Sequence, residues 1–164
     1  MRSRLMKEAL EGMLAGMAMA MLAMGAMLIR GQSPWRPVKL MAATLGGPGA
    51  AEGGAGTILL GGMIHLMMSA LFGLLFRPVL TLLGWRGTPP LPVAGLLYAL
   101  GLFAVNESVT LPAVDPTMAR RMPRLLFALS HLAYGMTLGV LTSQIGPTVA
   151  TALAPRSGER IGRA

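Results

Sequence analysis

Four long stretches of this sequence carry no charged residue, and they constrain its fold more than any other feature. They run over residues 12–29, 53–76, 87–106 and 125–155, with lengths of 18, 24, 20 and 31 residues. A helix of roughly 20 apolar residues crosses a hydrocarbon core about 30 Å thick, and in lipid each backbone amide needs an internal partner. The sequence therefore predicts an all-α, polytopic membrane protein. We expect a four-transmembrane-helix bundle with spans at about 8–29, 57–76, 91–111 and 124–146.

Prolines and glycines mark the expected ends of these spans. Pro78 is expected to end the second span, because proline disfavours helix in the residue before it. Pro147 is expected to close the fourth, leaving residues 147–164 as a C-terminal tail. The first loop, 30–56, begins with Trp35 at a membrane interface and has a short amphipathic pattern through Val38, Met41 and Leu45. Its "GGPGAAEGGAG" part holds six glycines in eleven residues and is interpreted as a flexible linker.

The distribution of charge favours a membrane and argues against nucleic acid. The net charge is +8, but the basic residues flank the spans and form no long stripe. With four spans both termini share one side, which holds 8 basic residues against 6 on the other, so the termini are predicted to be cytoplasmic. Glu8 and Glu11 favour an uncleaved first span over a signal peptide. The chain has no cysteine, which excludes thiolate sites.

The only two histidines head similar segments. "HLMMSALFGLL" begins at His65 and "HLAYGMTLGVL" begins at His131. A weaker match joins "LAGMAMA" at 14–20 to "VAGLLYA" at 93–99. These matches predict two parallel helical-hairpin repeats, related by an axis along the membrane normal. Chance similarity between apolar segments stays the alternative.

Helical spacing predicts where the imidazoles point. His65 shares a stripe with Ser69 and Gly73, and His131 shares one with Gly135 and Gly139. Gly12, Gly16 and Ala20 form a similar stripe on the first span. Small residues let transmembrane helices approach closely, and polar residues tend to face the bundle. We therefore expect both histidines to face inward at equal depths, about 12 Å into their helices.

Several roles for this pair are open on the sequence alone. The simplest has each imidazole neutral and bonded to a carbonyl or a hydroxyl, with Tyr134, Ser69, Ser130 and Thr137 available. No cofactor is then needed. The alternatives are a bis-histidine haem site, a metal or quinone site, and a proton relay with Glu107. Copper is a further one, since Met63, Met67 and Met68 surround His65, Met13, Met17, Met21 and Met24 line the first span, and thioethers suit Cu(I). Glu107 is otherwise expected to pair with Arg120, Arg121 or Arg124.

The "HLAYGMTLGVL" segment, the earlier histidine span and the Gly/Ala-rich first helix resemble small four-helix bacterial inner-membrane proteins classed as domains of unknown function. The similarity covers most of residues 8–146. It implies a bacterial plasma-membrane protein and carries over no catalytic residue. The methionine-rich first span and the glycine-rich loop have no counterpart in that resemblance.

The leading functional hypothesis is a non-enzymatic membrane protein that acts through helix contacts. It would be an accessory subunit of other membrane proteins or a homo-oligomer, with the lipid bilayer as its other partner. A small redox or metal-binding protein that uses His65 and His131 comes second. A proton-linked transporter comes third, because one carboxylate and four helices give little pathway.

Overall fold

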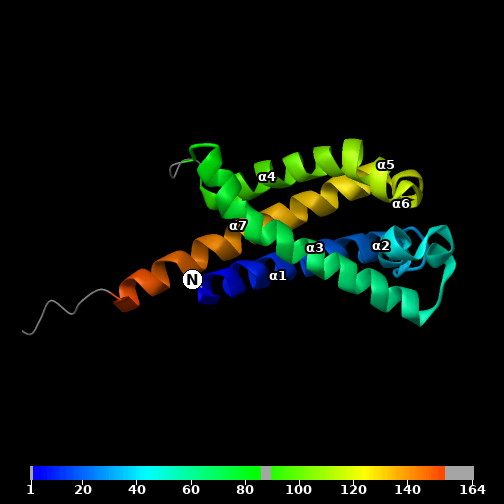
Figure 1. Cartoon of the computed structure of the whole chain (residues 1–164), viewed down its shortest axis with the longest axis horizontal. Coiled ribbons are helices and arrows are strands. Elements are labelled where there is room, and N and C mark those ends of the chain that lie inside the picture. The colour runs from blue at the N-terminus through cyan, green and yellow to red at the C-terminus, as the bar shows by residue number, and fades with distance from the viewer. Residues whose placement is uncertain (1, 86–89, 154–164) are drawn as a thin grey trace, which may run out of the picture.

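The computed structural model describes the backbone of residues 2–85 and 90–153 and the side chains through residue 144, and every element in these ranges is helical. In chain order they are α1 (Arg2–Ile29), α2 (Arg36–Gly46), the 3₁₀-helix η1 (Pro48–Glu52), α3 (Ala55–Leu82), α4 (Leu91–Val105), the π-helix η2 (Asn106–Thr110), α5 (Leu111–Val114), α6 (Pro116–Arg121) and α7 (Arg124–Leu153). Figure 1 shows their arrangement. The predicted all-α class is confirmed.

Within the described ranges, four helices are long enough and apolar enough to cross a membrane: Arg2–Ile29, Ala55–Leu82, Leu91–Val114 and Arg124–Gln144. Two predicted ends are wrong. The second helix continues through Pro78 to Leu82, and the backbone of α7 continues past Pro147 to Leu153. A proline inside a helix removes one backbone hydrogen bond, and the residues on both sides of each proline remain helical.

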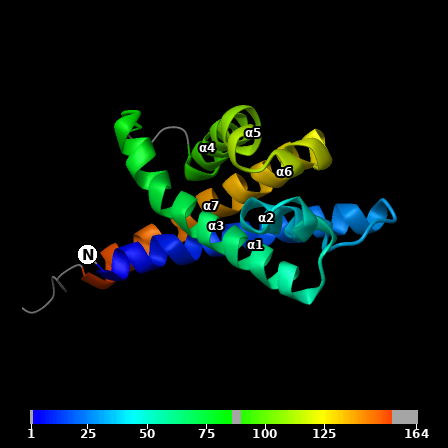
Figure 2. The same ribbon diagram turned by 45° about the vertical axis from the view of Figure 1, so that its right-hand side comes forward.

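The four helices pack as two pairs joined along one seam. Helix α1 packs on α3 and α4 packs on α7, while α1 and α7 join the pairs. Figure 2 shows α3 running obliquely across α1. The beginning of α1 and the end of α7 lie at one end of the molecule, and α2, α5 and α6 lie at the other (Figure 1). Both α3 and α7 therefore start at the end that carries the short helices.

Glycines bring the backbones together within each pair. A Cβ added to Gly73 would stand 2.6 Å from the Cα of Gly12, so α1 and α3 touch backbone to backbone. In the other pair, Gly95 of α4 faces Gly135 and Gly139 of α7 in the same way. Without the glycines neither pair could approach this closely.

The first loop is more ordered than the sequence suggested. Residues 36–46 form α2, which packs on α3 with Gly61 against the backbone of Val38. Its buried face includes Leu40 and Ala43. Of the three predicted amphipathic positions, Val38 and Met41 line a cavity, whereas Leu45 is exposed. Within the glycine-rich part, Pro48–Glu52 form the 3₁₀-helix η1, which the sequence did not predict.

The third span changes its helical pitch near the short helices. Its α-helix becomes π-helical over Asn106–Thr110 and returns to α-helix in α5. The next turn is capped by Asp115, whose Oδ1 accepts a 2.8 Å hydrogen bond from the backbone N–H of Met118. Oδ2 of Asp115 accepts a 2.8 Å bond from Thr44 and so joins α6 to α2.

Candidate ligand site between the hairpins

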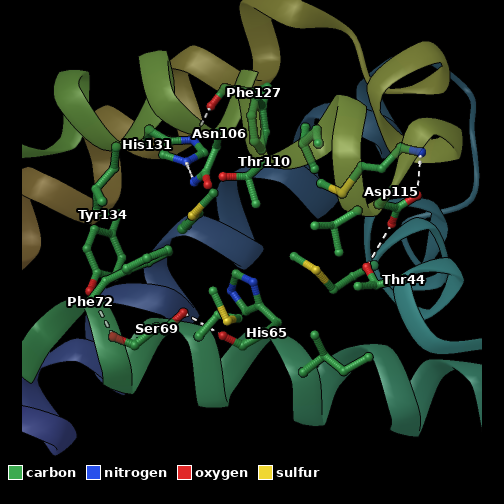
Figure 3. A pocket seen from close by; sticks show the side chains of 18 residues that line it. Thr44, His65, Ser69, Phe72, Asn106, Thr110, Asp115, Phe127, His131 and Tyr134 are labelled. Atoms are coloured by element: carbon green, nitrogen blue, oxygen red, sulfur yellow. Dashed lines mark hydrogen bonds between the residues drawn. The ribbon is translucent and has the colours of Figure 1, made fainter. Parts of the chain in front are cut away.

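A cavity of about 160 Å³ lies inside the bundle, and both histidines line it. His65 enters from α3 and His131 enters from α7 (Figure 3). The walls come from all four spans, and α2 and α6 lie at the end that carries the loops. The tertiary structure thus brings the two imidazoles, 66 positions apart in the chain, to one cavity.

His65 is held by the first span. Its Nε2 lies 2.8 Å from the carbonyl oxygen of Gly16, so this nitrogen carries the proton and donates it. Gly16 makes that approach feasible, because a side chain there would collide with Ser69. In the neutral ring, Nδ1 then keeps a lone pair.

His131 is held within its own helix and by the π-helix. Its Nδ1 donates to the carbonyl oxygen of Phe127 at 2.8 Å, and its Nε2 accepts from the amide of Asn106 at 3.3 Å. The ring is only 4% exposed and stands edge-on to the Phe127 ring. Nε2 is thus the nitrogen with a lone pair, engaged by a long hydrogen bond.

Both histidines therefore donate to backbone carbonyls, as the simplest sequence interpretation expected. Two of the four hydroxyls proposed as partners bond to backbone carbonyls instead. Tyr134 donates to the carbonyl of Ser69 at 2.9 Å and ties α7 to α3, while Ser69 donates to the carbonyl of His65. The buried hydroxyl of Ser130 has no hydrogen-bond partner among the described residues, and Ser130 lines an adjoining cavity of about 40 Å³.

Four methionine thioethers share the cavity with the imidazoles. They belong to Met19 of α1, Met41 of α2, Met68 of α3 and Met118 of α6. Figure 3 shows their sulfur atoms among the side chains around the cavity. Of these four, only Met68 was among the methionines that the sequence placed around His65, where it was grouped with Met63 and Met67.

The other methionines noted in the sequence point elsewhere. Met67 is 69% exposed and Met63 is 54% exposed on the outer face of α3. Met17 and Met21 are likewise exposed on α1. None of these four lines the cavity. The stripe predicted on the first span is therefore an outer stripe.

Four polar residues at the cavity were not noted in the sequence, and one of them is Thr44 of α2. The π-helix presents Asn106 and Thr110 to it, since the wider turn changes which residues share a face. Asp115 also lines it and is only 2% exposed. A π-turn has no sequence signature, but the proline after Asp115 does indicate a helix start.

Glu107 lies apart from this site. It pairs with Arg124, one of the three predicted arginines, at 3.2 Å, and that arginine side chain is 75% exposed. Glu107 does not line the cavity, so the structure does not bring it together with His65 and His131.

A second group of carboxylates is buried at the far end of the bundle. Glu8 pairs with Arg4 at 2.9 Å and with Arg77 of α3 at 3.5 Å. Glu11 accepts a 3.1 Å hydrogen bond from Thr142 of α7. These contacts join α1 to both of its neighbours.

Hard-metal chemistry finds no support in the described ranges, where no three His, Asp or Glu side chains converge as a metal site. Comparisons with protein families, curated proteins and solved structures give no match for this chain. The arrangement of its own residues is therefore what bears on its function.

Proposed function

We propose that this chain is a non-enzymatic membrane protein that binds a soft monovalent metal ion, Cu(I), between its two hairpins. The observation that carries the proposal is one cavity lined by two imidazoles and four thioethers. Imidazole and thioether are ligands that Cu(I) accepts readily, whereas Mg²⁺ and Ca²⁺ prefer oxygen. This is the metal-binding alternative from the sequence, with a particular metal assigned.

The hydrogen bonds of the histidines support this assignment. A metal-binding histidine almost always donates its other ring N–H to a carbonyl, a carboxylate or water. His65 donates to Gly16 and His131 donates to Phe127, which leaves one lone-pair nitrogen on each ring. Asn106 occupies that nitrogen of His131 only through a 3.3 Å bond, which a metal ion would replace.

The charge balance of the cavity also suits a monovalent cation. All six soft ligands are neutral, and a buried cation needs a compensating charge. Asp115 lines the same cavity as a buried carboxylate, held in place by Thr44 and by the N–H of Met118. One cation and one carboxylate would leave the site neutral.

The volume favours an ion over a haem. A cavity of about 150 Å³ holds a molecule the size of benzene, and the cavity here is about 160 Å³. A porphyrin contains four pyrrole rings and would force the helices apart. Methionine side chains are flexible and can close around a small ion without such a movement.

The test is a Cu(I) titration of the detergent-purified protein, without oxygen, against a coloured Cu(I) chelator. We expect one ion per chain, with sulfur and nitrogen neighbours in the X-ray absorption spectrum. Met68→Leu should weaken binding by at least the roughly 10–100-fold that loss of an outer-shell partner causes. Met67→Leu is the matched control, since Met67 is the exposed neighbour on the same helix. Both exchanges nearly conserve volume, so folding should survive.

Equal Cu(I) affinities for Met68→Leu, His65→Ala and the unaltered chain would overturn the proposal. So would a chain that stays helical and monodisperse but takes up no Cu(I). A visible haem spectrum in the purified protein would point to the other cofactor.

The second candidate is the accessory subunit or homo-oligomer that acts through helix contacts. The glycines at the contacts within each helix pair are already covered by this chain. A partner protein would therefore have to pack against other glycines. Gly25, Gly62 and Gly101 have open space beside them, and Met21 and Met67 are exposed near them. Cross-linking in native membranes tests it, with loss of a cross-linked species in Gly62→Leu as the expected result.

We also propose that the two pairs of helices are copies of one duplicated, parallel hairpin. Supporting this, Gly12 meets Ser69 and Gly73 much as Gly95 meets Gly135 and Gly139. By these contacts Gly12 corresponds to Gly95. The sequence match instead paired Gly95 with Gly16, which lies one helical turn after Gly12. A chain with its hairpins exchanged in order should then fold, and its failure to insert would contradict the duplication.

For location we propose the bacterial plasma membrane with cytoplasmic termini. The support is the resemblance and the small charge excess described above. Because the chain has no native cysteine, Ser3→Cys and Gly49→Cys can be labelled cleanly. An impermeant maleimide should label only the second in intact cells, and the reverse pattern would invert the topology.

A further inference from the structure

A second cavity, of about 450 Å³, lies where α2 meets α6, outside the four spans. It differs from the first in chemistry. Six polar residues line it: Gln32, Ser33, Arg36, Lys39, Glu52 and Arg121. Its volume falls within the range of roughly 300–1,000 Å³ that is usual for small-molecule sites.

Positive charge exceeds negative charge around this cavity. Glu52 is its one carboxylate and forms an ion pair with Arg121. Arg36 and Lys39 form no ion pair with any residue in the described ranges. They stand three positions apart on α2, and like charges at that spacing repel each other. An anion between them would relieve the repulsion.

The location adds two features that attract an anion. Arg36 is the first residue of α2, where the helix dipole favours negative charge. Trp35, directly before it, is 44% exposed, and tryptophan is enriched at the headgroup level of membranes. An exposed tryptophan beside the cavity favours a position at the level of lipid headgroup phosphates.

We propose that this cavity binds a phosphate group, carried by an anionic lipid headgroup or by a free phosphate. The guanidinium of Arg36 can donate two parallel hydrogen bonds to phosphate oxygens, and Lys39 adds a point charge. Gln32 and Ser33 supply neutral donors at the rim. The ion pair with Glu52 keeps Arg121 from the anion, so Glu52 lowers the affinity of the cavity for phosphate.

The test measures the thermal midpoint of the full chain in detergent with added phosphatidylglycerol, phosphatidylcholine or inorganic phosphate. We expect phosphatidylglycerol or phosphate to raise it, and phosphatidylcholine to leave it unchanged. Arg36→Gln with Lys39→Gln should weaken the effect at least about tenfold in ligand concentration. The matched control is Arg30→Gln with Arg120→Gln, which removes the same charge from the same end of the molecule but outside this cavity.

The outcomes separate the two sources of phosphate. A shift with phosphatidylglycerol alone identifies a lipid, and a shift with inorganic phosphate identifies a free anion. Glu52→Gln should strengthen either effect, because it releases Arg121. The proposal is overturned if neither probe shifts the midpoint, or if the control pair loses as much as the cavity pair, since attraction would then be non-specific.

Discussion

Gly12 and Gly73 touch where α1 crosses α3, and a Cβ added to Gly73 would stand 2.6 Å from the Cα of Gly12. Backbone atoms cannot move aside as a side chain would, so an extra methyl group must separate the two helices. This contact sets the distance between α1 and α3, and thereby the position of His65 against Gly16 one turn further along. Glycine packing and the histidine site are thus parts of one arrangement.

Gly73→Ala should destabilise the protein by about 1–3 kcal/mol, the usual cost of overpacking. Gly62→Ala on the same helix is the control, because it has nothing within 4 Å and alanine is the better helix former. Thermal unfolding in detergent measures both. Equal midpoints for the two variants would show that the close approach contributes little.

Asn106→Ala should leave Cu(I) affinity unchanged or raise it. The amide of Asn106 occupies Nε2 of His131 at 3.3 Å, so it competes with a metal for that lone pair. Competition with a Cu(I) chelator measures the change. A loss of affinity comparable to that of Met68→Leu would mean that Asn106 itself helps to hold the ion.

Thr44→Val should loosen α2 from α6. The hydroxyl of Thr44, on α2, donates a hydrogen bond to Asp115, which caps α6. Loss of a partner by a buried acceptor costs about 1–3 kcal/mol. Amide exchange over residues 36–46 should become at least about fivefold faster by this estimate. Thr57→Val is the control, since Thr57 bonds only within its own helix start.

If exchange over residues 36–46 is the same in both threonine variants, the contact between Thr44 and Asp115 does not hold α2 in place. Helix α2 would then be retained by its packing against α3 alone.

Glu8→Gln should cost more stability than Glu107→Gln. The Glu8 side chain is 6% exposed and joins α1 to Arg77 of α3, which is 33% exposed. The Glu107 side chain is 22% exposed, and its partner Arg124 is 75% exposed. Exposed ion pairs contribute about 0–1 kcal/mol, and disrupting charged hydrogen bonds of a buried group costs about 1–3 kcal/mol. Chemical unfolding in mixed micelles compares them. The reverse order would mean that the buried pair is not formed in solution.

Hydropathy determined the class of this protein, the number of long helices and most of their bounds, because a lipid-spanning backbone can satisfy its hydrogen bonds only as helix. It failed at Pro78 and Pro147, where the surrounding helix tolerates the missing N–H. It indicated an amphipathic segment where α2 lies, but it did not predict η1 or the packing of α2 on α3, since composition does not report contacts between elements.

The sequence also marked His65 and His131 as residues to explain, because an apolar chain places few polar groups at random. Only the tertiary structure decided that they face one cavity and that Met19, Met41 and Met118 join Met68 there. Those six residues lie on five elements of the chain, and helical phase within one element cannot reveal contacts between elements. The crossing of α1 over α3 and the π-turn of the third span bring these side chains together, and no local sequence pattern predicts either feature.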